Sequence, residues 1–317
     1  MIAFTRLGSY GLLGNQLFQY AYVRTMARRL GVPFYCPPWE GDRVFALDDG
    51  AERAAAAGEL RSRYVQEPRN CGWSPSAATV PDGTDVLGFF QSERYFDDPE
   101  AVRRWYRLTA PLERTVEEKA RRLGVDEAVG LHVRLGDKTR PPNSLVGVSA
   151  PPAYYRRALA RLGAGRVPLV VFSDDPAGAR RRLGEVGAGA SFVAGNADYE
   201  DLHLMARCRH LVCAPSTLSW WGAWLGERPG RVVVAPREWL RPGCGVACRD
   251  VTCARWIELP TRRVRDHYVW QALRHPYWAA WFAAEHGGSS AAAFRAARAV
   301  VRRLSGRRSG PRAPGES

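Results

Sequence analysis

The stretch AVGLHVRLGDK, residues 128–138, opens the part of the chain that decides the fold. It holds the first of several short β-rich runs, and a segment of helical length separates most of them. The later runs are PLVVFS at 168–173, ASFVA at 190–194, HLVCA at 210–214 and RVVVA at 231–235. Strands that alternate with helices predict βαβ crossovers and a parallel sheet. We therefore expect a Rossmann-like α/β domain over residues 126–260.

The beginning of the chain carries the same kind of signal. Residues 2–5 form a short apolar run, the loop LGSYGLLG follows at 7–14, and apolar side chains then recur at helical spacing as far as Gly31. This pattern predicts the first strand and helix of an α/β layer within residues 1–125. The roughly ninety residues that follow Cys36 are less regular, and they allow no strand order to be assigned.

Composition limits the class of protein. The 317 residues are 46% hydrophobic and carry 46 Lys plus Arg against 32 Asp plus Glu, a formal net charge of +14. Only Lys119 and Lys138 are lysines, and the arginines are spread along the chain without a zinc finger or an aromatic RNA-binding motif. We therefore expect no nucleic-acid partner, although an arginine-rich nucleic-acid-binding protein remains the hypothesis from a second functional class.

The end of the chain is the most basic part. From Thr261 onward there are eleven arginines against three acidic residues, a surplus of +8. We expect an aromatic and arginine-rich helical segment over 261–304 and a disordered tail over 305–317. The helix expected at about 290–304 has a narrow apolar stripe beside arginines. That stripe could lie on an anionic membrane surface or pack on the protein body, and the sequence leaves both open.

The sequence suggests a cytoplasmic setting. No apolar run approaches the roughly 20 residues of a membrane-spanning helix, and the N-terminus does not resemble a cleaved secretory signal. The seven cysteines form no CxxC pair, which fits a reducing compartment. Cys244, Cys248 and Cys253 lie close in sequence, but their spacing fits no zinc pattern, so we expect no metal site.

Polar side chains follow several of the predicted strands. Ligands of parallel sheets lie at the carboxyl ends of the strands, so these positions are the candidate site residues: His132, Arg134, Asp137, Asp174, Ser216 and Thr217. An arginine beside hydroxyls at a helix N-terminus suits a diphosphate. There is no GxGxxG loop, no P-loop and no D-x-D pair in the middle of the chain, so arginine rather than a metal ion would neutralise that diphosphate.

Each candidate also has a purely structural interpretation. His132 could be a core histidine, and Arg134 with Asp137 could form a structural ion pair. One of the two aspartates at 174–175 could cap the following helix. Ser216 and Thr217 could likewise cap the helix that carries Trp220, Trp221 and Trp224. These tryptophans have the spacing of a buried helix face rather than of a sugar platform.

Five ordered motifs resemble the bacterial α-1,2-fucosyltransferases of glycosyltransferase family eleven. They are GLLGNQLFQYAY at 11–22, GFFQSERYF at 88–96, HVRLGDK at 132–138, FSDD at 172–175 and CRHLVCAPSTLSWWGAWL at 208–225. The resemblance implies a GT-B-like fold, with two Rossmann-like domains that face each other across a cleft. It also implies an inverting, metal-independent transfer of L-fucose from GDP-fucose to the 2-hydroxyl of a galactose residue in a glycan acceptor.

The resemblance assigns roles to the candidate residues. Arg134 would contact the β-phosphate of GDP-fucose, with Asp137 orienting its loop and His132 nearby. Asp174 would reach the guanine or its ribose, and Ser216 with Thr217 would hold phosphate oxygens. Asn15 and Gln16 would face the cleft from the first domain, and Gln91 and Glu93 are candidate acceptor contacts. The catalytic candidates are Arg134 and Asp137, and Asp137 and Glu93 remain alternatives for the general base.

Two positions depart from the family pattern. Leu135 stands where the family has a second arginine, and Pro215 stands where it has an asparagine before the Ser-Thr pair. Either change could weaken or shift donor binding. A transferase of the same architecture that uses a different nucleotide sugar is therefore the alternative enzyme.

Overall fold

The computed structural model describes residues 1–66, 70–136, 147–165, 167–241, 244 and 246–261. Two sheets dominate this part of the chain, and every strand pair in both is parallel. The prediction of two Rossmann-like α/β halves is confirmed. Both sheets belong to one compact unit that spans Met1–Arg241 and resumes at Val246.

The first sheet contains the N-terminal strands in the order β2-β1-β4-β3. Its strands are β1 (Ile2–Ala3), β2 (Phe34–Tyr35), β3 (Ser62–Val65) and β4 (Thr84–Leu87). In the centre, Ile2 pairs with Phe34 on one side and with Thr84 on the other. The strand β3 lies inside the segment for which the sequence pattern allowed no assignment, because its residues are mostly exposed and lack an apolar periodicity.

The second sheet has six strands in the order β10-β9-β8-β5-β6-β7. They are β5 (Val129–His132), β6 (Leu169–Phe172), β7 (Ser191–Phe192), β8 (His210–Val212), β9 (Val233–Pro236) and β10 (Ile257–Leu259). If the six strands are numbered 1 to 6 along the chain and the sheet is read from β7 to β10, the order is 3-2-1-4-5-6, which is the order of the Rossmann fold. The strand order therefore reverses between β5 and β8.

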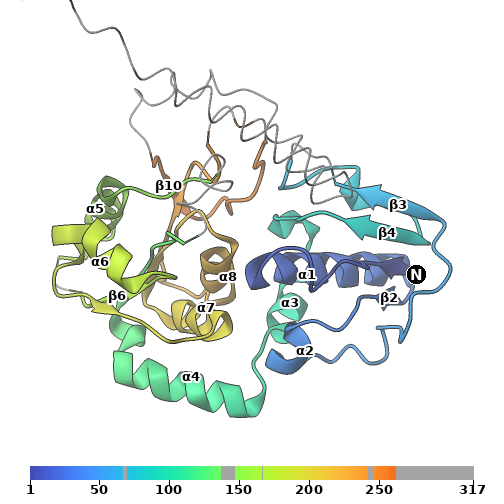
Figure 1. Ribbon diagram of the computed structural model, residues 1–317, viewed down its shortest axis with the longest axis horizontal. Coiled ribbons are helices and arrows are strands. Elements are labelled where there is room, and N and C mark those ends of the chain that lie inside the picture. Colours follow the sequence, from blue (N-terminus) through green and yellow to red (C-terminus); the bar gives the residue numbers. More distant parts are fainter. Residues whose placement is uncertain (67–69, 137–146, 166, 242–243, 245, 262–317) are drawn as a thin grey trace, which may run out of the picture. The chain divides into compact units, whose positions relative to one another are not determined.

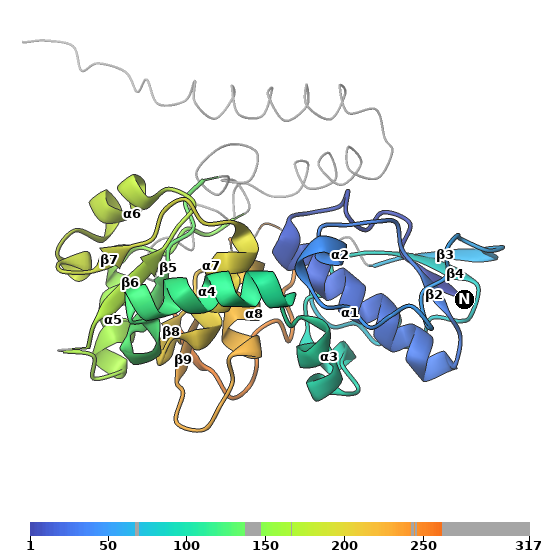
Figure 2. The same cartoon turned by 90° about the horizontal axis from the view of Figure 1, so that it is seen from below.

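Helices of the described residues alternate with these strands (Figure 1). The longer ones are α1 (Leu13–Leu30), α4 (Ala110–Leu123), α5 (Pro152–Arg161), α6 (Pro176–Leu183), α7 (Asp198–Arg207) and α8 (Thr217–Leu225). Short helices are α2 (Gly41–Val44), α3 (Pro99–Trp105) and the 3₁₀ turns Ala77–Thr79, Glu93–Tyr95, Val125–Glu127 and Gly184–Gly187. Figure 2 shows α4 beside α7, with which it is in contact.

Helices α1 and α8 pack directly against each other. Phe18 of α1 lies 4.5 Å from Trp220 and 4.7 Å from Trp221, measured between ring centroids. Trp220, Trp221 and Trp224 have no exposed surface. Their indole N–H groups donate to the carbonyl oxygens of Val251 and Gly14 and to the Glu93 carboxylate, respectively. The prediction that these tryptophans form core rather than a sugar platform is confirmed.

The remaining domain predictions concern residues outside this description. The helical segment expected at 261–304 and the tail expected at 305–317 lie outside the described residues except for Thr261. The division near residue 125 stays a prediction, although all strands of the first sheet precede it and all strands of the second follow it. Within the described part of the chain, no helix combines the length and the apolar character needed to cross a membrane.

Candidate active site

The candidate site starts where the second sheet reverses its strand order. Leu131 of β5 pairs with Val212 of β8, so the segments that leave these two strands start side by side. Arg134 comes shortly after β5, and Ser216 and Thr217 come shortly after β8. In a doubly wound sheet this position, beyond the carboxyl ends of the strands, is where ligands bind. The topology thus brings together the residues that the sequence predicted as diphosphate contacts.

Asp174 holds the loop that carries Arg134. Its carboxylate accepts the N–H of Leu135 at 2.9 Å and lies 3.2 Å from Nε of Arg134. Gly136 also lies against Asp174, so closely that a Cβ at this position would collide with the carboxylate. Asp174 thus holds both the backbone and the guanidinium of the segment that carries Arg134. A carboxylate can accept about four hydrogen bonds, so Asp174 could also accept one from a nucleotide.

Other side chains tether the backbone of the same strand end. Ser149 Oγ donates to the Arg134 carbonyl, Ser173 Oγ donates to the Val133 carbonyl, and Tyr155 donates to the His132 carbonyl. Sequence reasoning missed Ser149 and Tyr155, because a hydroxyl that bonds to a distant carbonyl leaves no periodic signal. Together these bonds tether the backbone of residues 132–134 at the end of β5.

His132 is a buried, neutral histidine. It is 2% exposed, and burial, together with the nearby positive charge of Arg134, lowers its pKa to about 3. Its Nδ1 has no hydrogen-bond partner among the described residues. An imidazole of this kind cannot add positive charge to a diphosphate site, so the structure favours the core interpretation. Direct donor contact by His132 stays a prediction.

Ser216 and Thr217 begin helix α8. Ser216 is its N-cap residue, and its side chain makes no capping hydrogen bond within the described part of the chain. Ser219 Oγ stabilises this turn by donating to the carbonyl oxygens of Ala214 and Ser216. Ser216 and Thr217 are partly exposed, so their hydroxyls place donors at the positive end of the helix dipole, which favours an anion.

Gly14 allows the first turn of α1 to reach this place. A Cβ at residue 14 would lie 2.6 Å from Oγ1 of Thr217 and 2.7 Å from the backbone nitrogen of Leu218. In addition, the Gly14 carbonyl accepts the indole N–H of Trp221 at 3.0 Å. The N-terminal turns of α1 and α8 are thus in direct contact, and only a glycine fits between them.

Two of the predicted acceptor contacts lie together on the first half. Gln91 Nε2 donates to Oδ1 of Asn15 at 3.0 Å, although 76 residues separate them. Both side chains are partly exposed. Gln16 points elsewhere: it is 7% exposed, and its Nε2 donates to the Gly11 carbonyl at 3.0 Å. Gln16 therefore supports the glycine-rich loop, and Asn15 and Gln91 are the pair that can face a ligand.

Glu93 belongs to a structural ion pair. Its two oxygens accept from the Arg255 guanidinium at 2.7 Å each, and one also accepts the Trp224 indole N–H at 3.0 Å. Burial raises the pKa of Glu93, but the hydrogen bonds from Arg255 and Trp224 outweigh it and hold the pKa below its usual value. A carboxylate held in this way is a poor proton acceptor. We leave Glu93 out of the site proposed below.

The Asp-Asp pair divides its tasks. Asp175 is the N-cap of α6, where its side chain accepts the N–H of Gly178 at 2.8 Å, whereas Asp174 holds the loop that carries Arg134.

The other catalytic candidate, Asp137, lies outside the described residues. Leu135 is 7% exposed and packs in the core of the second half. The position of the family's second arginine is therefore an apolar, buried position in this chain.

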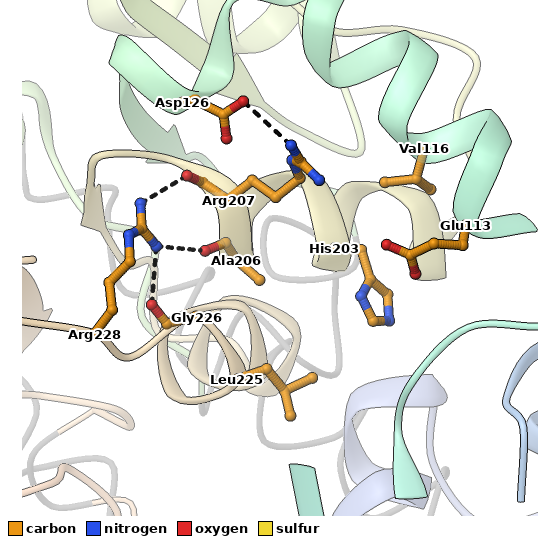
Figure 3. A pocket seen from close by; sticks show the side chains of 9 residues that line it. All are labelled: Glu113, Val116, Asp126, His203, Ala206, Arg207, Leu225, Gly226 and Arg228. Carbon is orange, nitrogen blue, oxygen red and sulfur yellow. Dashed lines mark hydrogen bonds and ion pairs between the residues drawn. The ribbon is translucent and has the colours of Figure 1, made fainter. Parts of the chain in front are cut away.

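A separate pocket of about 400 Å³ lies between α4 and the C-terminal ends of α7 and α8 (Figure 3). Residues from α4, the C-terminal end of α7 and the C-terminal end of α8 line it, among them Glu113, His203 and Arg228. Burial lowers the pKa of His203 to about 4, so the ring is neutral. Helices α7 and α8 lead into β8 and β9, so their C-terminal ends lie at the amino edge of the sheet. None of the predicted site residues lines this pocket, and we do not assign the donor to it.

No group of three or more His, Cys, Asp or Glu side chains in the described ranges could hold a metal ion. Only the described residues are covered by this statement. Independence of a metal therefore stays a prediction from the absence of a D-x-D motif and from the family resemblance.

The profile of glycosyl transferase family 11 matches residues 82–243, slightly more than half of the chain. The chain belongs to glycosyl transferase family 11. The matched range includes Gln91, Arg134, Asp174 and the Ser216–Thr217 pair, so most of the site described above falls within it.

Two curated proteins of Escherichia coli are similar to parts of this family 11 chain. One is the O-antigen biosynthesis glycosyltransferase WbnK, 34% identical over 136 residues, which are 41% of this chain and 43% of WbnK. The other is an alpha-1,2-colitosyltransferase, 27% identical over 168 residues, 51% of this chain and 58% of that protein. The chain thus spans about half the length of the curated relatives that it matches.

The solved structures that are similar to this chain include NodZ and POFUT1. The fucosyltransferase NodZ from Bradyrhizobium has a TM-score of 0.45 and 15% identity, over 70% of this chain and 92% of that one. POFUT1 in complex with GDP has a TM-score of 0.48 and 12% identity, over 74% of this chain and 97% of that one. Both TM-scores are low, and the fold assignment above rests on the sheet topology.

Proposed function

We propose that this family 11 protein transfers L-fucose from GDP-fucose to the 2-hydroxyl of a galactose residue, with inversion and without a metal ion. The observation that carries the proposal is that Arg134 and the first turn of α8 follow the paired strands β5 and β8, where the second sheet reverses its strand order. A nucleoside diphosphate needs both positive charge and N–H or O–H donors, and this place offers both.

The reaction would be a single displacement. The 2-hydroxyl of the acceptor attacks C1 of fucose from the face opposite the diphosphate, the C1–O bond to the β-phosphate breaks, and GDP leaves with the electron pair. The positive charge of Arg134, the hydroxyls of Ser216 and Thr217 and the dipole of α8 would stabilise the charge that develops on GDP. Preorganised donors of this kind can each contribute about 3–4 kcal/mol to the barrier reduction.

The first half would present the acceptor. Asn15 and Gln91 hold each other through the Nε2–Oδ1 bond, which leaves the amide N–H₂ of Asn15 and the carbonyl of Gln91 for sugar hydroxyls. Asp137 is the proposed general base, since the alternative carboxylate of Glu93 is engaged by Arg255. The acceptor that we propose is a galactose-terminated intermediate of a bacterial surface polysaccharide, handled in the cytoplasm or at the inner face of the membrane.

A ligand panel tests the nucleotide. GDP at about 100 times its Kd should raise the free energy of unfolding by about 2.7 kcal/mol, while UDP and dTDP should add little. The Arg134→Ala variant should lose this response, and the matched control Arg114→Ala, which removes an exposed arginine of α4, should keep it. An equal response to all three nucleotides would exclude guanine recognition.

A second donor has a specific observation in its favour. Because one of the similar proteins is an alpha-1,2-colitosyltransferase, a colitosyl donor is the alternative for this chain. Colitose lacks the 3-hydroxyl of fucose, and a site that binds a hydroxyl rejects a sugar that lacks it. The comparison of kcat/KM for GDP-fucose and GDP-colitose on one β-galactoside, with linkage analysis of the product, distinguishes the two. Preference for GDP-colitose would replace fucose in the proposal.

A further inference from the structure

Two loops from the two halves of the protein run side by side. Residues 70–73 connect β3 to β4 in the first half, and residues 246–250 connect β9 to β10 in the second. The N–H of Cys71 donates to the Ala247 carbonyl and the N–H of Trp73 donates to the Arg249 carbonyl, each at 3.1 Å. The contact is so tight that a Cβ at Gly72 would collide with the Arg249 carbonyl.

This contact brings two thiols together. The sulfur atoms of Cys71 and Cys248 are 3.0 Å apart, although 177 residues separate them in sequence. Asn70 pairs with Ala247 in parallel register, so Cys71 and Cys248 are the next residues in register on the two segments. All seven cysteines lie within the described residues, and none is in a disulfide. A disulfide bond is about 2.05 Å long, so the sulfur atoms need to move together by only about 1 Å.

The same loops are held by a charged group beside the thiols. The Arg94 guanidinium donates to the Asp250 carboxylate at 2.7 Å and stacks over the Trp73 ring, 3.6 Å from its centroid. These contacts keep the two segments aligned while the thiols are reduced. The disulfide would therefore preserve the arrangement seen here and would not require a new one.

The thiol pair is also connected to the candidate site. The Cys71 carbonyl accepts the backbone N–H of Gln91 at 2.8 Å, and the Gln91 side chain donates to Asn15. A covalent bond at Cys71 would therefore restrain the segment that carries the proposed acceptor contacts.

The other thiols are less suited to oxidation. Cys36, Cys208, Cys213 and Cys253 are buried, and burial raises the pKa of each of them. Because the thiolate is the reactive form, these four react slowly. Cys71 and Cys248 are partly exposed and can be reached by a small oxidant.

We propose that Cys71 and Cys248 are a reversible oxidation site that joins the two halves of the protein through a disulfide. The oxidant is a low-molecular-weight disulfide such as oxidised glutathione. One of the two cysteine thiolates attacks it, forms a mixed disulfide and releases one glutathione thiolate. The other cysteine thiolate then attacks the protein sulfur of the mixed disulfide and releases the second. Two cysteine thiols are oxidised, one glutathione disulfide is reduced to two glutathione thiols, and no atom is added to the protein.

The test uses the full chain treated with oxidised glutathione under native conditions. We expect a mass loss of two hydrogen atoms, a Cys71–Cys248 peptide pair after digestion, and complete reversal by dithiothreitol. The disulfide closes a long loop in the unfolded chain, so Tm should rise by on the order of 5 °C. Exchange of the Gln91 amide hydrogen should slow in the oxidised form.

Variants decide whether this pair is responsible. Cys71→Ser and Cys248→Ser should each abolish the cross-link and the rise in Tm, whereas the matched control Cys244→Ser should keep both. A stable glutathione adduct without a cross-link would overturn the proposal, and so would a cross-link that joins Cys244 to Cys248. Neither readout depends on which sugar the protein transfers.

Discussion

Gly14→Ala tests whether the contact between α1 and α8 builds the anion site. The added Cβ would lie 2.6 Å from Thr217 Oγ1, 2.7 Å from the Leu218 nitrogen and 2.8 Å from the Thr217 carbonyl carbon. Two of these three atoms belong to the backbone, so side-chain rotation cannot relieve the clash. Overpacking of this kind costs about 1–3 kcal/mol, while alanine in place of glycine in a helix gains about 0.5–1 kcal/mol.

The expected net result is a loss of about 1–2 kcal/mol in the free energy of unfolding, measured by urea denaturation. The same clash pushes the first turn of α8 away from its present position. If one charge-assisted hydrogen bond to the diphosphate is lost, GDP should bind roughly 10 to 100 times more weakly in calorimetry.

Gly50→Ala is the matched control, because nothing lies within 4 Å of a Cβ at that position and its backbone is not left-handed. It should change neither unfolding nor GDP binding. If Gly14→Ala unfolds at the same urea concentration as the unsubstituted protein and binds GDP equally well, the contact has no part in the site and the reasoning is wrong.

Substitutions at three further positions address the site and the stability of the fold. Arg134→Ala should lower kcat/KM for the donor by at least about 10²-fold. Arg134→Lys should recover only part of the lost kcat/KM, because an ammonium lacks the planar fork of a guanidinium, and full recovery would argue against a bidentate contact. Leu135→Arg should lower Tm, because the residue is 7% exposed and a buried charge costs roughly 2 kcal/mol or more; a stable variant with a lower donor KM would contradict this. Burial raises the pKa of Glu52, but hydrogen bonds from Arg28 and Arg24 lower it to about 2. This folded-state pKa lies below the ordinary value, so the stabilisation is present above about pH 4.5 and is lost as the pH falls towards 2. Glu52→Gln should reduce the loss of unfolding free energy as the pH falls, measured by urea unfolding between pH 2 and 7. An unchanged dependence on pH would refute this assignment.

Much of the second half could be predicted from the sequence. The β-rich runs at 128–135, 168–173 and 210–214 are apolar on both faces, as strands buried between two layers of helices must be, and the residues after them had to gather at one edge of the sheet. This is why Arg134, Asp174 and Ser216 could be named before their contacts were known. The tryptophans of α8 were predictable for the same reason, since helical spacing defines a buried face.

The first half was harder, because short strands with polar residues carry little periodicity. β1 and β2 have two residues each, and β3 is largely exposed. The hydrogen bond between Asn15 and Gln91 joins residues from different motifs. Family resemblance suggested both residues, but no local pattern indicated that they touch.

Only the tertiary structure decided the task of individual side chains. The sequence left open which of Asp174 and Asp175 caps the following helix, and in the structure Asp175 caps α6 while Asp174 holds the segment that carries Arg134. In the same way, Glu93 became an ion-pair partner of Arg255, and Cys71 came to lie 3.0 Å from Cys248. Periodicity depends on neighbours a few residues apart, so the sequence by itself determines which faces are buried and which strand ends carry polar groups. The partner of a polar side chain depends on chain segments that meet only after the sheets have formed and packed.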